Sequence, residues 1–375
     1  MNLNLPSSVD ACRAWLEKDP LNVEAARQLR EGIAAAEWHD DPALMALWEA
    51  CVVLDGGAEG NVVEAVDRTP RKLDRSRHEA LVVHPREKRE RRHKLASLFG
   101  RVLHLLEGDE TARAIARVTE KATPQTFPQL CRAVEACAQA LDMNAPDIRI
   151  ARGEERLFTV MVDRSPFLCV HHDFVSEGDG AAPQRLSLAE MRFGVAHNLQ
   201  HIKGGHAALL QISPERLEDL ILEQVPFLVR TPIKLGTKVL GWTRANRAVK
   251  RVSELLPKKS RTQKVVNTVG ELLPDAEQET VLPEVVHDWV RSWIQGVEFS
   301  ADRAGLLLSG SLAASCQALL HLAPDYAPHI SDARRRGVRW LLQEKADVDR
   351  TTADRVRELL RFAVSAEYLR FVGGK

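Results

Sequence analysis

Two histidines in the segment Ser187–His206 have the spacing of a metal site on a helix. His197 and His201 stand four residues apart, so on a helix their imidazoles share one face and can reach one ion. The same segment contains a signal for the start of a helix. Ser187 and Glu190 have the spacing of a capping box, in which each side chain accepts a hydrogen bond from the other residue's backbone N–H. We therefore predict a helix that begins after Ser187 and presents both histidines to a divalent cation.

A second stretch supplies the third candidate ligand. The helix predicted after Pro283 carries Glu298 and Asp302 four residues apart, so both carboxylates lie on one helical face. The chain has 13 histidines in 375 residues. About half of chains with this composition would contain a histidine pair at this spacing by chance, so the carboxylates add weight to the pair. Without the histidines, a charged helix face that forms salt bridges would be the better interpretation.

Together the two stretches resemble the HtpX-like and CAAX-prenyl-protease-like zinc metallopeptidases. That family has H-E-x-x-H on one helix, which is similar to HNLQH at 197–201, and a third-ligand motif on another, which is similar to EFSADRAG at 298–305. The resemblance implies an α+β, mainly α, zincin-like domain with a small antiparallel sheet. It also implies zinc on His197, His201 and Glu298, with Asp302 hydrogen-bonded to a ligand histidine. Arg303 is expected to pair with one of the two carboxylates.

One position departs from the family. Asn198 stands where these peptidases have the glutamate that takes a proton from the zinc-bound water. A carboxamide has no proton affinity near neutral pH, and the neighbouring Gln200 is an amide too. Loss of this general base costs roughly 10²- to 10⁴-fold in rate. The resemblance therefore favours a protein that retains the fold and zinc but is catalytically impaired or inactive.

Three functions stay open at this point. The first is a pseudopeptidase that keeps the groove, with or without zinc, and uses it for protein binding or regulation. The second is an active zinc-dependent endopeptidase in which another group supplies the base. The third is a helical scaffold or adaptor with a vestigial site. In the first, a protein or peptide partner could add as a strand along residues 157–170.

Composition and charge narrow the classes of partner. Lys plus Arg and Asp plus Glu both total 52, so the overall charge does not favour a nucleic acid or a membrane. The basic run at 68–94 has no aromatic residue on which a base could stack, so we interpret it as a solvated helix face or connector. Six scattered cysteines are typical of a reducing compartment. The first 19 residues lack the pattern of a signal peptide, and no apolar run reaches the ~20 residues of a membrane span. We therefore expect a cytoplasmic protein without a transmembrane segment.

Hydrophobic periodicity suggests three parts. Residues 1–60 are predicted to form a helical hairpin, weakly similar to a tetratricopeptide pair, with helices that follow Pro20 and Pro42. A basic helical connector at 61–124 precedes the zincin-like domain at 125–375. The elements expected in that domain are a helix at 127–141, strands at 148–150, 157–162 and 167–170, the two site helices, a lid-like basic insertion at 214–282, a helix break near Gly310, and two amphipathic helices between 332 and 371.

Three further histidines are interpreted as structural. His171 and His172 follow the last predicted strand, and because adjacent strand residues point to opposite faces they do not readily share one metal ion. His206 follows two glycines and is predicted to be a polar residue at the frayed end of the helix.

Overall fold

The computed structural model of the protein describes residues 5–36, 40–56, 70–92, 110–153, 157–176, 185–208, 217, 283–345 and 349–374. The chain divides into two compact units. The first consists of Met1–Lys88, Glu107–Gln211 and Gln295–Lys375, and the second of Arg89–Leu106 and Ile212–Ile294. All candidate site residues belong to the first unit. Apart from residue 217, the predicted insertion at 214–282 lies outside the described residues.

A small sheet forms one side of the first unit. Its strands are β1 (Glu120–Lys121), β2 (Asp147–Ala151), β3 (Phe158–Val162) and β4 (Pro166–His171), in the order β1-β2-β4-β3. The prediction of an antiparallel sheet is wrong, because β2 and β4 run parallel, whereas the other two pairs are antiparallel. The most apolar strand, β4, takes a central place. A strand that is buried on both faces has a continuous run of apolar residues in its sequence, as β4 does. The three predicted strands are present, and β1 was not predicted.

The two faces of the sheet are covered by different helices. Leu168 and Val170 of β4 point into the main core of the unit, whereas Phe167 and Cys169 point to the other face and form a small cluster with Ala112. Ala112 belongs to α7 (Glu110–Val118). This alternation is what a strand between two packed layers requires.

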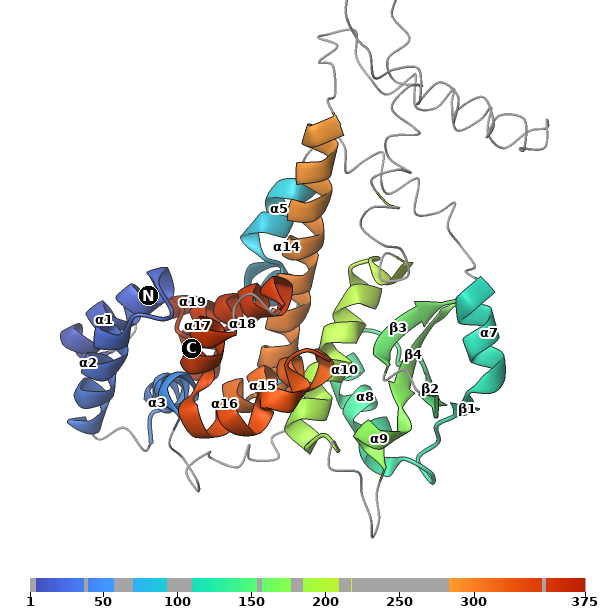
Figure 1. Cartoon of the computed structure of the whole chain (residues 1–375), viewed down its shortest axis with the longest axis horizontal. Helices are drawn as coiled ribbons and strands as arrows, with labels where there is room; N and C mark the ends of the chain where they lie inside the picture. The colour runs from blue at the N-terminus through green and yellow to red at the C-terminus, as the bar shows by residue number, and fades with distance from the viewer. Residues whose placement is uncertain are drawn as a thin grey trace, which may run out of the picture. The chain divides into compact units, whose positions relative to one another are not determined.

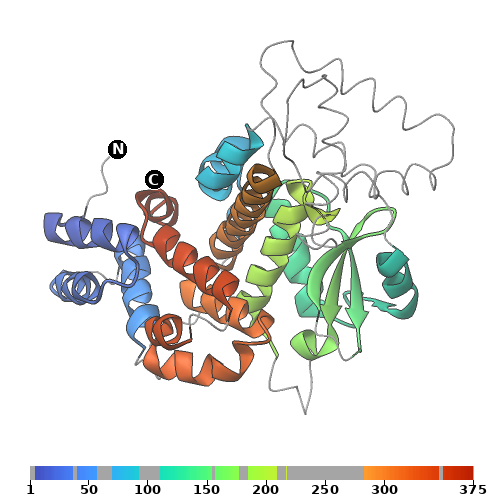
Figure 2. The same cartoon turned by 45° about the horizontal axis from the view of Figure 1, so that its top comes forward.

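Helix α10 (Leu188–Lys203) lies between the sheet and the C-terminal helices, and two views show this order (Figures 1 and 2). It contacts α8 (Pro128–Ala140), α15 (Leu312–Leu322) and strand β3. The long helix α14 (Pro283–Ser309) stops where predicted, because Gly310 adopts a φ of +71° that favours glycine. After α15 the helices are α16 (Ile330–Arg336), α17 (Val338–Glu344), α18 (Arg350–Ala363) and α19 (Ala366–Val372). The two helices predicted between 332 and 371 are thus four shorter ones. The prediction of a mainly helical α+β protein is confirmed.

The N-terminal region has three helices instead of the predicted two. They are α1 (Ser7–Lys18), α2 (Val23–Ala34) and α3 (Pro42–Asp55). Asp41 caps α3 by accepting from the N–H groups of Ala43 and Leu44, which fits its place before a proline at the first helical position. Helix α3 contacts α15, α17 and α19, so these helices share the main core.

The segment 70–92 is more buried than its charge suggested. It contains α4 (Arg75–Arg77), a π-helical turn (His78–Val82) and α5 (Pro85–Arg91). Within the first unit Glu87 is fully buried, and a Cβ added at Gly296 would lie 2.7 Å from the backbone nitrogen of Glu87. A solvated helix face therefore describes only part of the basic run.

In the second unit, the Trp289 and Trp293 rings stack with centroids 5.8 Å apart, and Arg89 donates to the Ser292 hydroxyl. In the ranges that the structure describes, no helix is long and apolar enough to cross a membrane.

Candidate metal site

Helix α10 starts as its sequence predicts. The Ser187 hydroxyl accepts from the N–H of Glu190 at 3.3 Å, and a Glu190 carboxylate oxygen accepts from the N–H of Ser187 at 2.7 Å. His321 of α15 lies 3.1 Å from the other carboxylate oxygen. The capping box is thus confirmed, and Glu190 also links α10 to α15.

Small residues let α14 approach α10 closely. A Cβ added at Gly305 would lie 2.5 Å from the Phe193 ring, so only glycine leaves room for this buried aromatic side chain. One and two turns before Gly305, the same helix presents Asp302 and Glu298 toward α10. The approach therefore puts both carboxylates within reach of the histidines.

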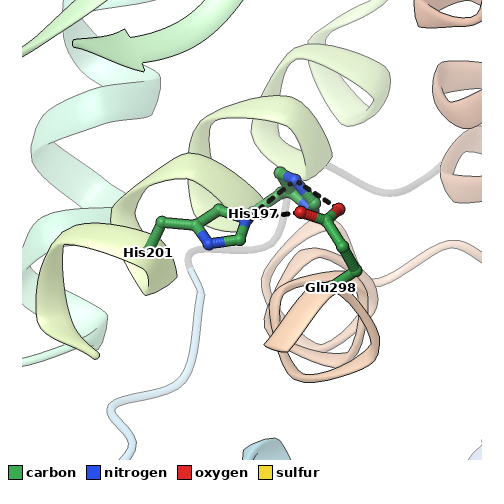
Figure 3. A group of neighbouring side chains, drawn as sticks. All are labelled: His197, His201 and Glu298. Atoms are coloured by element: carbon green, nitrogen blue, oxygen red, sulfur yellow. Dashed lines mark hydrogen bonds and ion pairs between the residues drawn. The ribbon is translucent and has the colours of Figure 1, made fainter. Parts of the chain in front are cut away.

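His197, His201 and Glu298 converge on one point (Figure 3). The two Nε2 atoms lie 3.2 Å apart, and the Glu298 oxygens lie 3.5 Å from Nε2 of His201 and 3.7 Å from Nε2 of His197. A tetrahedral zinc ion with bonds of about 2.0–2.1 Å would separate its ligand atoms by about 3.3–3.4 Å. The separation of the two Nε2 atoms is close to that value, and each of these atoms has a different Glu298 oxygen within 3.7 Å, Oε1 for His201 and Oε2 for His197. Among the described residues this is the only such group of three.

His201 has the environment of a neutral ligand. The residue is fully buried, and burial, together with the neighbouring His197 and Arg355, holds its pKa well below the ordinary value. A neutral imidazole keeps one nitrogen lone pair, which a metal ion can take. Its Nδ1 has no hydrogen-bond partner within the described part of the chain.

Asp302 orients the other imidazole. Its Oδ1 lies 3.0 Å from Nδ1 of His197, an arrangement that places the proton on Nδ1 and the lone pair on Nε2. Arg355 of α18 donates to both Asp302 oxygens, at 2.7 and 2.9 Å, and lies 3.2 Å from a Glu298 oxygen. Burial alone would raise the pKa of Asp302, but the Arg355 charge and these hydrogen bonds hold it well below its ordinary value. Asp302 is therefore ionised near neutral pH.

The prediction that Arg303 pairs with Glu298 or Asp302 is wrong. Its guanidinium lies 3.3 Å from Glu358 and over the Phe362 ring, and the cation beside Glu298 and Asp302 is Arg355. Arg355 was not predicted from the sequence. A signal was present, because Arg355 lies one turn from each of the buried residues Thr352 and Leu359 on α18.

Asn198 does not point toward the three ligands. Its Oδ1 accepts from the N–H of Val160 at 2.9 Å, and its Nδ2 donates to the carbonyls of Phe158 at 3.3 Å and Gly194 at 2.8 Å. The side chain is buried and its donors are both used. The residue at the general-base position is therefore part of the contact between α10 and β3.

His206 and His171, two of the histidines interpreted as structural, lie outside the group of three. His206 is not at a frayed end, because it is buried, its N–H donates to the carbonyl of His201, and its Nε2 lies 3.5 Å from Glu87. His171 is buried and its Nε2 lies 2.9 Å from the carbonyl oxygen of Gly153.

Comparison of the chain with protein-family models, curated proteins and solved structures finds no match. What the site does must therefore be argued from the side chains themselves. Two imidazoles and one carboxylate form a donor set that suits zinc.

Proposed function

We propose that this protein is a zinc-binding, metallopeptidase-like protein that does not cleave peptide bonds and acts by binding another protein. The proposal depends on how the side chains of His197, Asn198 and His201 are oriented on α10. The Nε2 atoms of His197 and His201 lie 3.2 Å apart, close to one edge of a zinc tetrahedron, and the Glu298 carboxylate has an oxygen within 3.7 Å of each. Asn198, the residue that follows His197, turns its side chain to β3 instead.

The donor set supports zinc over harder cations. Calcium and magnesium take six or more oxygen ligands, whereas zinc accepts two nitrogens and one oxygen and keeps a fourth position for water. A bound zinc ion would lower the pKa of such a water. In this chain Asp302 orients His197, and Arg355 forms ion pairs with both carboxylates at one side of the site.

Among the residues that the structure describes, the carboxylates beside the site are both engaged and provide no free base. Glu298 is a ligand candidate, and Asp302 is engaged by Arg355 and His197. An ionised carboxylate whose pKa is held this low is a poor proton acceptor. These engagements support an inactive site and a role in binding or regulation.

Zinc content and peptidase activity test the proposal together. Protein stripped with a chelator and reloaded should hold one zinc ion per chain by mass spectrometry, His201→Ala should hold none, and the control His172→Ala should hold one. The loaded protein should leave unfolded β-casein intact. Cleavage that chelators abolish would favour an active endopeptidase with another base. Failure of the wild type to bind zinc would favour the scaffold alternative.

A further inference from the structure

Strand β3 is an edge strand with a defined set of outward groups. In the order β1-β2-β4-β3, it pairs with β4 on one side and with no other strand of the described ranges. The carbonyl of Leu157 accepts from the N–H of His171 at 2.6 Å, so residue 157 belongs to the bonded side. Antiparallel pairs alternate, so Thr159 shares that side, whereas the backbone groups of Phe158 and Val160 point to the free edge. A free edge of this kind is a template for another strand.

The Asn198 side chain occupies this part of the edge. A carboxamide carries the same carbonyl acceptor and N–H donor as a peptide group. Its Oδ1 takes the outward N–H of Val160, and its Nδ2 reaches the outward carbonyl of Phe158. An incoming strand would need these same two backbone groups. All three residues are buried, with exposed fractions of 2% for Asn198, 0% for Val160 and 9% for Phe158.

We propose that Asn198 acts as an internal mimic of a peptide group that closes the β3 edge. Helix α10 packs on β3 at this point, so an extended peptide can add at Phe158 and Val160 only if the carboxamide lets go and this stretch of α10 moves away from the strand. The contact is therefore autoinhibitory for strand addition. The proposal concerns where a partner binds and does not depend on zinc, because none of the hydrogen-bonding atoms is a metal-ligand candidate. It also gives Asn198 a role beyond the absence of a base.

Two variants separate the hydrogen bond from general packing. Asn198→Ala removes both contacts to β3, whereas Asn198→Asp keeps an acceptor for Val160 and loses the donor to Phe158. Hydrogen exchange of the Val160 amide, measured by NMR in chelator-treated protein, should accelerate at least about tenfold in the alanine variant and stay slow in the aspartate variant. The amide of Thr159, which faces β4, is the internal control. Gln200→Ala, a buried amide on the same helix that bonds His78, is the matched control variant.

Binding completes the test. Fluorescence anisotropy of labelled β-casein should show no binding to the wild type or to Gln200→Ala, and binding to Asn198→Ala. Unchanged Val160 exchange in a folded alanine variant would overturn the proposal, as would accelerated exchange without any gain of casein binding. Both readouts are made without metal, so a failure here is distinct from a failure to bind zinc.

Discussion

Asp302→Asn tests how the site is built. Asp302 is 2% exposed and joins three helices, because it receives hydrogen bonds from Arg355 of α18 and lies 3.0 Å from Nδ1 of His197 on α10. Asparagine has nearly the same shape but no charge. In the variant, Arg355 would have Glu298, at 3.2 Å, as its nearest remaining carboxylate. The metal and the guanidinium would then compete for the Glu298 oxygens.

Two magnitudes follow for Asp302→Asn. Loss of a group that orients a metal ligand costs typically about 10- to 100-fold in metal affinity, or about 1.4–2.7 kcal/mol. Removal of one partner of a buried ion pair costs about 3–5 kcal/mol of stability, and the remaining Glu298 contact places this variant near the lower end. Because the folded-state pKa of Asp302 is depressed, its contribution is present above the unfolded pKa and is lost as the pH falls below about 4.

The assays are a competition titration of zinc against a chromophoric chelator and urea unfolding, both at pH 7. The control is Asp288→Asn, an exposed carboxylate on the same helix, for which neither quantity should change. Zinc affinity equal to that of the wild type in a folded Asp302→Asn protein would refute the idea that Asp302 orients His197. If zinc affinity and stability fell equally in Asp302→Asn and Asp288→Asn, the cause would be the lost negative charge on α14 and not the position of Asp302.

Three further predictions follow from the packing and charge of the same unit. Gly305→Ala places a methyl group against the Phe193 ring, so urea unfolding should show a loss of about 1–3 kcal/mol and zinc titration a weaker site. Burial raises the pKa of Glu358, but hydrogen bonds from His84 and nearby arginines lower it to about 2. The ionised Glu358 therefore stabilises the fold above about pH 4, and this stabilisation is lost toward pH 2. The difference in unfolding free energy between the wild type and Glu358→Gln should shrink over that range. Asn198→Glu supplies a base but loses both amide donors, so thermal unfolding should show lower stability and casein assays no cleavage; efficient zinc-dependent cleavage would contradict this.

Local signals in the sequence predicted local structure well. The capping box at Ser187, the helix start at Pro42 and the break at Gly310 each depend on neighbouring residues alone, and all three occur as expected. That His197 and His201 share one face of α10 is also a local property, because it follows from helix geometry.

Features set by distant parts of the chain were harder to predict. The strand order depends on which strand is buried most completely. The sequence suggested antiparallel pairing of strands that follow one another in the chain, but β4 lies between β2 and β3. Arg355 is 53 residues from its hydrogen-bond partner Asp302, whereas Arg303 is adjacent to it and was therefore expected to pair there. Helical geometry argues against that pairing, because successive residues point about 100° apart.

Asn198 has no proton affinity near neutral pH, but its side chain contributes hydrogen bonds to the fold. A glutamate at this position could not donate to the Phe158 and Gly194 carbonyls, so an active site would have to leave those acceptors to other groups. The carboxamide satisfies both and also the N–H of Val160. Its hydrogen bonds cross from the metal helix to the sheet edge, so the residue that lacks proton affinity also fixes the helix that carries His197 and His201. Peptidase chemistry at this site would therefore need changes in β3 as well as at residue 198.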